Sequence, residues 1–313
     1  MNTPNSISND AELVEVINSK IRVEARRHGV DPFIFRSRFV FPYFLRLLFA
    51  DSSPGESPWL LQGATSLVSR TQGGRFTRDI DLSWAQHLAE ESVGEAFSGL
   101  LASKPQSGPF TFVLDRIRRT SRPSPDGYRP ATFNARVIVM IGGEFFHRIE
   151  FDLGVQRHTQ LPPEDVLVEP VLKASGLNFP PFIVPAVPIA AHISDKVCAM
   201  YEVHHSGAST RYHDLGDIVR IIRYLDFSAE NLLRTLDHEA RRRGVDLPAT
   251  MVAPAPEWEV KFPVVARGWA EYPAELCDLG ASLALAGTCL NEILSGERTS
   301  GQWDHSTGQW NDG

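Results

Sequence analysis

Cysteine is scarce in this sequence, which argues against a disulfide framework and against a cysteine-based zinc cluster. The chain has 313 residues and three cysteines, Cys198, Cys277 and Cys289. Three is an odd number, and no two of them have CxxC spacing. Such usage is typical of a protein in a reducing cytoplasm.

Long apolar runs are also missing. The longest, residues 39–50, is interrupted by Pro42 and Arg46, and it is far shorter than the roughly 20 apolar residues of a transmembrane helix. The first ten residues contain no basic region followed by an apolar one, so we expect no signal peptide. With 42% hydrophobic and 22% charged residues, the composition is typical of a soluble globular protein.

An excess of positive charge is absent as well. The formal net charge is −7 and the pI is near 5.8, which argues against a protein that coats nucleic acid non-specifically. One region departs from this average, because six arginines are opposed there by Asp126 alone: Arg116, Arg118, Arg119, Arg122, Arg129 and Arg136. This arginine cluster is interpreted either as solvated surface or as a face for a polyanion.

The first half of the chain predicts a sheet domain of the α/β (α+β) class. Apolar spacing predicts helices and strands in the order helices, strand, helix, strand, helix and a strand meander. The predicted segments are a helix at 10–28, an apolar segment at 33–49, a strand at 59–62 that turns into a helix at Gly63, a strand at 75–84, a helix at 86–101 and strands at 110–118, 132–141 and 145–155. Gly142-Gly143 indicates a hairpin between the last two strands.

The second half predicts a different organisation. From Leu161 the chain is rich in proline, and we expect a crossing linker with little regular structure. After Pro188 the apolar residues recur at helical spacing. From Ser295 the sequence is polar and Gly-rich, which favours a flexible tail. The predicted domains are 1–185 for the sheet domain with its N-terminal helices and linker, 186–294 for a helical lobe and 295–313 for the tail.

Two acids dominate the chemistry of the sequence. Asp79 and Asp81 are two residues apart on a predicted strand, so both carboxylates project from one face. Two like charges at this spacing repel each other unless a cation lies between them. Magnesium, held by carboxylates and by substrate phosphates, is the usual such cation. Isolated DxD pairs also occur in surface turns, but the interleaved Ile80 and Leu82 favour a strand with one buried face.

A third acid would complete a site for two metal ions, which activates an attacking hydroxyl and stabilises a leaving pyrophosphate. Asp152, in the segment RIEFDLG, lies on a later predicted strand between apolar residues. Glu150 is the alternative on the same face. Some thirteen residues before Asp79, Gly63 and Ser66 lie between a predicted strand and a predicted helix, where backbone N–H groups can approach a triphosphate. An ordinary strand-to-helix turn is the alternative for that segment.

The combined pattern resembles the nucleotidyltransferase fold related to DNA polymerase beta, and more narrowly the AbiEii toxins, which include the mycobacterial MenT toxins. The resemblance is carried by four segments: Gly63-Ala64-Thr65-Ser66-Leu67, Arg75-Phe76-Thr77-Arg78-Asp79-Ile80-Asp81-Leu82, Ile193-Ser194-Asp195-Lys196-Val197-Cys198-Ala199-Met200 and Arg211-Tyr212-His213-Asp214-Leu215-Gly216-Asp217-Ile218. They follow one another in the family's order and at its spacing. Ala64 replaces the family's second glycine, and Gln62 replaces the lysine that often precedes the turn.

The resemblance implies a two-lobed enzyme with a role for each matched residue. It implies catalytic roles for Asp79, Asp81, Lys196 and Asp214, nucleotide contacts from Gly63, Ser66, Lys196 and Arg211, and two Mg²⁺ ions on Asp79, Asp81 and Asp152. Lys196 and Asp214 would come from the helical lobe across a cleft. The alternatives are a solvated surface lysine for Lys196 and a helix N-cap for Asp214.

By the same resemblance, the protein is expected to be a cytoplasmic toxin that moves a nucleotide from a nucleoside triphosphate to the 3′ end of tRNA and so blocks translation. A cognate antitoxin would restrain it. Some MenT-type toxins are inactivated by phosphorylation of a serine at the position of Thr77, so Thr77 is expected to be a regulatory phosphorylation site. The alternatives are transfer to a protein or a small molecule, and a non-catalytic relative that binds RNA or a partner.

Overall fold

A computed structural model describes residues 5–49, 58–71, 77, 79–84, 90–121, 131–155, 161–172, 177, 179–204 and 207–312. The chain divides into two compact units. The sheet unit comprises Met1–Ser69, Phe76–Arg157 and Asp165–Ala186, and the helical unit comprises Arg70–Arg75, His158–Glu164 and Val187–Gly313. The predicted mixed α/β class with two lobes is confirmed.

The sheet unit is built on eight strands in the order β3-β4-β5-β6-β2-β1-β8-β7. Their bounds are β1 Trp59–Gln62, β2 Asp79–Trp84, β3 Gln106–Ser107, β4 Phe110–Ser121, β5 Thr132–Ile141, β6 Glu144–Val155, β7 Glu164–Val168 and β8 Phe182–Ala186. The hairpin predicted at Gly142-Gly143 joins β5 to β6, and both glycines have positive φ. β2 pairs antiparallel with β1 and parallel with β6, so the short strand β2 lies in the interior of the sheet.

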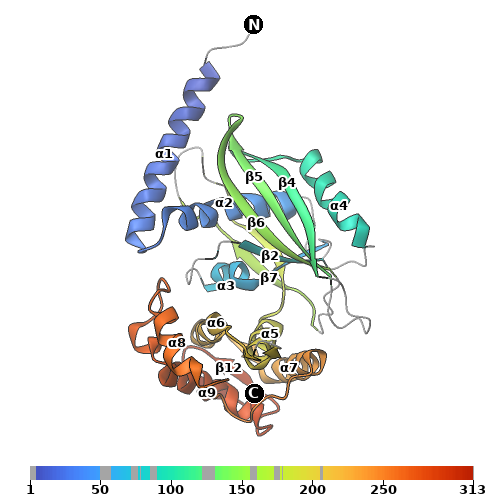
Figure 1. Cartoon of the computed structure of the whole chain (residues 1–313), viewed down its shortest axis with the longest axis vertical. Coiled ribbons are helices and arrows are strands. Elements are labelled where there is room, and N and C mark those ends of the chain that lie inside the picture. Colours follow the sequence, from blue (N-terminus) through green and yellow to red (C-terminus); the bar gives the residue numbers. More distant parts are fainter. Residues whose placement is uncertain are drawn as a thin grey trace. The chain divides into compact units, whose positions relative to one another are not determined.

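Helices cover one face of this sheet (Figure 1). The unit contains α1 (Asn5–Arg27), α2 (Pro32–Phe49), α3 (Gly63–Thr71) and α4 (Glu90–Ser103). Phe44 of α2 and Phe97 of α4 contact the ring of Phe151 on β6, with centroids 4.4 and 5.9 Å apart. Along β5, Ala135 and Val137 are buried while Arg136 between them is only half-buried. This alternation directs Arg136 and Asn134 to the opposite face of the strand.

The proline-rich segment after Leu161 differs from its prediction as an irregular linker. It contains β7 and β8, which extend the sheet beyond β1. Val166, Val168 and Val184 are buried in the core. Burial of these β-branched side chains stabilises strands that the proline content conceals, because several of the prolines, such as Pro170 and Pro180, lie between the two strands.

The helical unit contains α5 (Ile189–Tyr201), α6 (Tyr212–Tyr224), α7 (Ala229–Arg243), α8 (Glu257–Ala266) and α9 (Leu279–Leu294), with a 3₁₀ turn at Ala274–Cys277. Two short strands, β9 (Val203–His204) and β10 (Gly207–Ala208), form a small hairpin. No helix in the described ranges is long and apolar enough to span a membrane.

The C-terminal segment is ordered, in contrast to the predicted flexible tail. β12 (Gln302–Asp304) and β13 (Gln309–Asn311) form a hairpin that pairs with β11 (Phe227–Ser228). Trp303 is 1% exposed, and its Nε1 donates to the carbonyl of Ile222 at 2.8 Å. Burial and hydrogen bonding of this indole therefore stabilise the hairpin despite the polar, Gly-rich composition of the segment.

Candidate active site

Four carboxylates lie on the face of the sheet opposite α2 and α4. In β2, Ile80 and Leu82 are fully buried, which directs Asp79 and Asp81 to the other face. The parallel register of β2 and β6 pairs Asp79 with Glu150 and Asp81 with Asp152. The structure thus brings together the three predicted metal ligands and the predicted alternative, Glu150.

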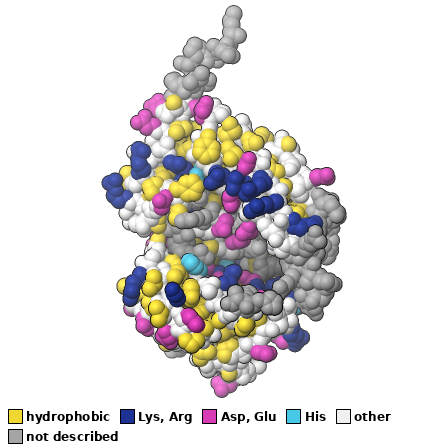
Figure 2. All heavy atoms as spheres, in the orientation of Figure 1, with side chains coloured by type: hydrophobic (Ala, Val, Ile, Leu, Met, Phe, Trp, Pro, Cys, Tyr) yellow, Lys and Arg dark blue, Asp and Glu magenta, His cyan; other side chains and the backbone are white. Residues whose placement is uncertain are grey.

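The neighbouring strand β5 distinguishes the two acids of β6. Arg136 donates two hydrogen bonds, of 3.1 and 3.0 Å, to one carboxylate oxygen of Glu150. Asp152 instead accepts from the neutral amide of Asn134 at 3.0 Å and is exposed. Figure 2 shows basic side chains beside acidic ones on the surface of the sheet unit. Because an arginine already neutralises Glu150, Asp152 is the better candidate for a cation ligand.

Gly63 lies against Asp81 at the junction of β1 and α3. Its φ is +64°, and a Cβ at this position would lie 1.7 Å from Oδ2 of Asp81. Glycine is therefore required both for the backbone conformation and for the space that the carboxylate occupies. Ser66, the other predicted nucleotide contact on α3, is fully buried, so Gly63 is the accessible one of the two. Thr65 donates to the carbonyl of Asp79 at 3.2 Å.

Thr77 contacts the carboxylate of Asp79 directly. It lies outside β2, which begins at Asp79, so its predicted place on the same strand was wrong. Its hydroxyl nevertheless donates to Oδ1 of Asp79 at 2.6 Å and lies 3.2 Å from the carbonyl of the same residue. Thr77 is 9% exposed.

The acids of the sheet are the type of ligand that Mg²⁺ prefers, but their oxygen atoms do not converge on one point. All three predicted ligands are carboxylates, the hard oxygen donors that Mg²⁺ takes. Among the described residues, a set of three ligand atoms mutually within 4.8 Å occurs only at Asp226, Asp304 and His305, not at Asp79, Asp81 and Asp152. Coordination by the latter set would therefore require side-chain rotation.

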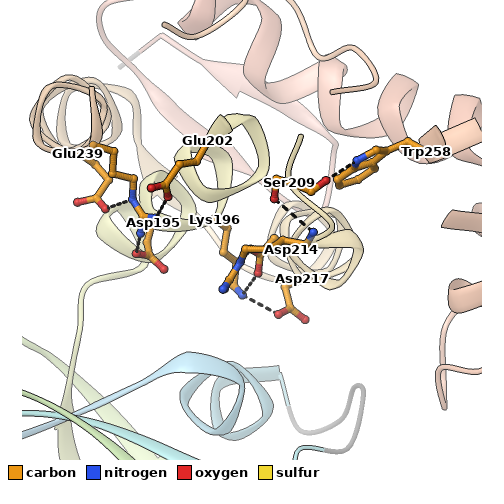
Figure 3. Close-up of polar contacts among 10 residues, drawn as sticks. Asp195, Lys196, Glu202, Ser209, Asp214, Asp217, Glu239 and Trp258 are labelled. Atoms are coloured by element: carbon orange, nitrogen blue, oxygen red, sulfur yellow. Dashed lines mark hydrogen bonds and ion pairs between the residues drawn. The ribbon is translucent and has the colours of Figure 1, made fainter. Parts of the chain in front are cut away.

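The helical unit carries a second charged group, centred on Lys196 of α5. Figure 3 shows Lys196 extending toward Asp214 and Asp217 of α6. Its Nζ lies 3.2 Å from Oδ1 of Asp214 and 2.6 Å from Oδ2 of Asp217. The Lys196 side chain is 6% exposed, and those of the two aspartates are 2% and 3% exposed. The alternative of a solvated surface lysine is therefore wrong.

Asp214 is bound by two cations and is not a helix cap. The residue at the N-cap of α6 is Arg211, and it makes no side-chain cap hydrogen bond. Nε of Arg211 lies 2.5 Å from Oδ2 of Asp214. The N-cap interpretation of Asp214 was wrong, because the helix begins at Tyr212 and not at Leu215, as an N-cap at Asp214 would require.

Asp217 is a functional candidate that we did not predict. It contacts Lys196 more closely than Asp214 does. The sequence contains a signal for it, since residues three apart on a helix share one face and Asp217 follows Asp214 at that spacing. The local pattern could not show which side chain the pair faces.

A separate ion-pair network joins α5 to α7. Arg243 contacts Asp195, Glu202 and Glu239 at 2.6 to 2.7 Å. Burial raises the pKa of Glu239, but hydrogen bonding from Arg242 and the charge of Arg243 outweigh burial and lower it. Of the three consecutive arginines at 241–243, only Arg241 is a solvated surface residue, with a side chain 77% exposed.

The sequence profile of the family described as "Nucleotidyl transferase AbiEii toxin, Type IV TA system" matches residues 46–279. The chain belongs to the AbiEii nucleotidyltransferase toxin family. Every predicted site residue lies within the matched range. This membership makes the protein a toxin–antitoxin nucleotidyltransferase by family, as the resemblance of its motifs indicated.

Solved structures are similar to this AbiEii protein over most of its length. MenT4, a nucleotidyltransferase toxin from Mycobacterium tuberculosis H37Rv, is similar over 89% of each chain, with 17% identity and a TM-score of 0.52, which shows a shared fold. JHP933 from Helicobacter pylori is similar over 84% of this chain and 94% of its own, with 13% identity and a TM-score of 0.48. No curated protein matches the chain.

Gly63→Ala tests the contact between the turn and Asp81. Gly29 has a φ of +65° and nothing within 4 Å of the place that a Cβ would occupy, so Gly29→Ala is the matched control. Both substitutions should cost about 1–2 kcal/mol of stability from backbone strain. Only Gly63→Ala should also displace Asp81, and we expect it to abolish nucleotide transfer while Gly29→Ala retains it. Equal activity of the two folded variants would contradict the role of this contact.

Lys196→Met tests the buried ion triad. Removing the ammonium leaves the carboxylates of Asp214 and Asp217 buried together, which should destabilise the protein by about 3–5 kcal/mol in chemical denaturation. Lys261→Met changes an exposed lysine of α8 in the same unit and should alter stability by no more than about 0.5 kcal/mol. If the two variants are equally stable, Lys196 is not held as described.

Proposed function

We propose that this AbiEii protein is a magnesium-dependent, cytoplasmic enzyme that transfers a nucleotide from a nucleoside triphosphate to the 3′ end of tRNA. Such transfer would block aminoacylation and translation, and a cognate antitoxin would restrain it. The observation that carries the proposal is the alignment of Asp79, Asp81 and Asp152 on one open sheet face beside Gly63. That set combines oxygen ligands for a cation with a glycine turn that backbone N–H groups can use to bind phosphate.

The residues of the sheet unit have separate roles in this proposal. Asp79, Asp81 and Asp152 hold two Mg²⁺ ions. Bound there, the ions would supply activation of the attacking 3′-hydroxyl and charge neutralisation on the leaving pyrophosphate. Gly63, at the start of α3, leaves room for Asp81 and lets the backbone approach the phosphates.

The Lys196 group serves the same reaction by binding the triphosphate. Lys196 is held by Asp214 and Asp217, so a phosphate oxygen would replace one of these carboxylates at Nζ. Asp214 keeps the ammonium in place and also orients Arg211, which is 56% exposed and contacts phosphate. The desolvated surroundings of Lys196 strengthen such a charge-assisted contact.

Transfer itself can be measured with each labelled triphosphate and total tRNA in the presence of Mg²⁺. We expect one triphosphate to label the RNA. Asp79→Asn and Asp81→Asn should each lower the rate by about a hundredfold or more, with the fold intact. Asp165→Asn, which changes an exposed acid of β7, is the control and should have no effect. Full activity of either site variant at saturating Mg²⁺ would contradict the metal roles.

The same experiment separates the alternatives. Label on a protein or on a small molecule, with none on RNA, would identify a different acceptor. RNA binding without transfer of any triphosphate would identify a non-catalytic relative. Chelation of divalent cations should stop the reaction, and activity that survives chelation would exclude Mg²⁺ dependence.

Part of the arginine cluster supports an RNA acceptor. Across β4 and β5, Arg116 pairs with Arg136 and Arg118 pairs with Asn134, so both β4 arginines lie on the face that carries the acids. Arg119 lies on the opposite face, over the ring of Phe133 at 5.7 Å. Two of the six arginines of the cluster, Arg122 and Arg129, lie outside the described residues.

Charge reversal of Arg116 and Arg118 together should weaken tRNA binding while nucleotide affinity stays unchanged. Losing two phosphate contacts should lower the slope of log affinity against log salt by about 2. Arg119→Glu, on the other face, is the control and should leave the slope unchanged. Equal losses of tRNA and nucleotide affinity would assign the two arginines to the nucleotide site.

We also propose that Thr77 is a regulatory phosphorylation site. Its hydroxyl is 2.6 Å from the Asp79 carboxylate, so a phosphate there would bring about −1.5 to −2 charge next to a metal ligand and compete with the triphosphate. Mass spectrometry of the toxin co-expressed with its antitoxin should find phosphate on Thr77. Thr77→Val should escape inhibition, whereas Thr65→Val, which loses only a bond to the Asp79 carbonyl, should not. An unmodified Thr77 in a fully inhibited complex would exclude the mechanism.

A further inference from the structure

The sheet face that carries the acids changes in character along its strands. The registers of β4, β5 and β6 place the side chains of this face in successive rows across the three strands. The first two rows contain Asp152 and Glu150 with their β5 partners Asn134 and Arg136. Two further rows continue the face away from the acids: Val113, Ile138 and Arg148, then Thr111, Met140 and Phe145. The surface that holds the proposed metal ligands therefore continues into side chains of a different kind.

Four apolar side chains of the two further rows form a patch that is open to solvent. Val113 on β4 is 45% exposed and Phe145 on β6 is 66% exposed. Ile138 and Met140, on the strand between them, are half-buried, and Arg148 is exposed beside Ile138. We call the four apolar residues the outer patch. Adjoining exposed apolar side chains with a charged rim are typical of a binding surface.

A β-bulge turns the ring of Phe145 to this face. The register of β5 and β6 pairs Val139 with His147 but Met140 with Phe145, so Phe146 is the extra residue of β6. Phe146 and His147 are both buried, whereas strict alternation would direct Phe146 outward and Phe145 into the core. No ring or cation of the described residues packs on Phe145. Its face is therefore available for stacking.

Arginines lie between the outer patch and the acids. Arg116 and Arg118 follow Val113 on this face of β4, and Arg148 lies between Phe145 and Glu150 on β6. Nε of Arg116 is buried and has no hydrogen-bond partner among the described residues. Figure 2 shows basic side chains in a row on the sheet unit, with hydrophobic side chains on one side of the row and acidic ones on the other. A matching ligand has negative charge along its length and a flat apolar group at one end.

We propose that the outer patch binds an unpaired base of the acceptor RNA, stacked on Phe145, while Arg116, Arg118 and Arg148 bind phosphates between that base and the 3′ end. Single-stranded RNA combines both features, since its bases stack on aromatic side chains and its backbone follows basic ones. Phe145 and Asp152 both lie on β6, and at about 3.3 Å per residue they are roughly 20 Å apart. RNA that reaches both therefore spans several nucleotides. The inference rests on the proposed function for the reacting 3′ end, and it adds recognition of a base upstream of it.

Binding experiments test the stacked base without requiring transfer. The ligands are a single-stranded RNA of about ten nucleotides, an abasic strand of the same length and charge, and a non-hydrolysable nucleoside triphosphate. Phe145→Ala removes the ring, Phe145→Leu keeps apolar bulk without a flat face, and Phe145→Trp keeps a flat face. The control Phe33→Ala changes an aromatic residue of α2 that is 48% exposed and packs against His147 on the core side of β6. Thermal unfolding confirms that each variant is folded.

We expect Phe145→Ala and Phe145→Leu to weaken RNA binding by about tenfold and to leave the abasic strand and the triphosphate unchanged. Phe145→Trp should retain RNA binding, and Phe33→Ala should change nothing. Arg148→Ala should weaken the RNA and the abasic strand alike and lower the salt slope by about 0.7. Arg27→Ala, a change of an arginine of α1 whose side chain is 76% exposed, is its control and should leave both affinities unchanged.

Other results would overturn the inference. These are absence of RNA binding by the unaltered protein, unchanged RNA affinity of Phe145→Ala, and equal losses for the RNA and the abasic strand. Weaker binding of the antitoxin with unchanged RNA affinity would assign the outer patch to the antitoxin instead. RNA binding that depends on Phe145, without transfer of any triphosphate, would contradict the proposed function alone. Transfer to RNA with the same KM for RNA in Phe145→Ala would contradict the inference alone.

Discussion

Burial of Ile80 and Leu82 is the constraint on which the candidate site depends. These side chains are fully buried against the helices that cover the sheet, and successive side chains of a strand face opposite ways. Asp79 and Asp81 must therefore face away from the core. A slip of one residue would bury both carboxylates and expose both apolar side chains. The positions of the acids are thus fixed by the hydrophobic core rather than by contacts among the acids.

Strand pairing then extends this arrangement across the sheet. The parallel register of β2 with β6 adds Asp152 beside Asp81, and the antiparallel register of β6 with β5 adds Asn134 beside Asp152. The partner on β5 decides whether the charge of each acid is compensated. Glu150 is paired with an arginine, whereas Asp152 is paired with a neutral amide. An acidic set next to arginines on β4 is the kind of surface on which a metal site and a polyanion site adjoin.

The helical unit gathers its charges by burial instead of by strand register. Lys196, Asp214 and Asp217 are removed from water together, so each depends on the others for compensation of its charge. Such a triad holds the lysine in one position. It also means that any anion that approached Nζ would have to displace a carboxylate.

Local patterns in the sequence were sufficient to predict the helices and strands that carry the motifs. The strand before Gly63, the helix after it and the helices of Lys196 and Asp214 were all predicted, because apolar periodicity records burial along one element. The resemblance to the AbiEii toxins added residue roles that periodicity does not contain. Local patterns did not predict the strands β7 and β8 or the C-terminal hairpin, because these strands are stabilised by pairing with distant segments.

The sequence by itself determined the directions of Asp79 and Asp81 and the family to which the chain belongs. Tertiary structure decided which charges neutralise one another. It paired Glu150 with Arg136, buried Lys196 between two aspartates and brought Trp269 onto Gly216. The physical reason is that alternation and spacing describe one element at a time, whereas the partner of a charge is set by packing between elements far apart in the chain.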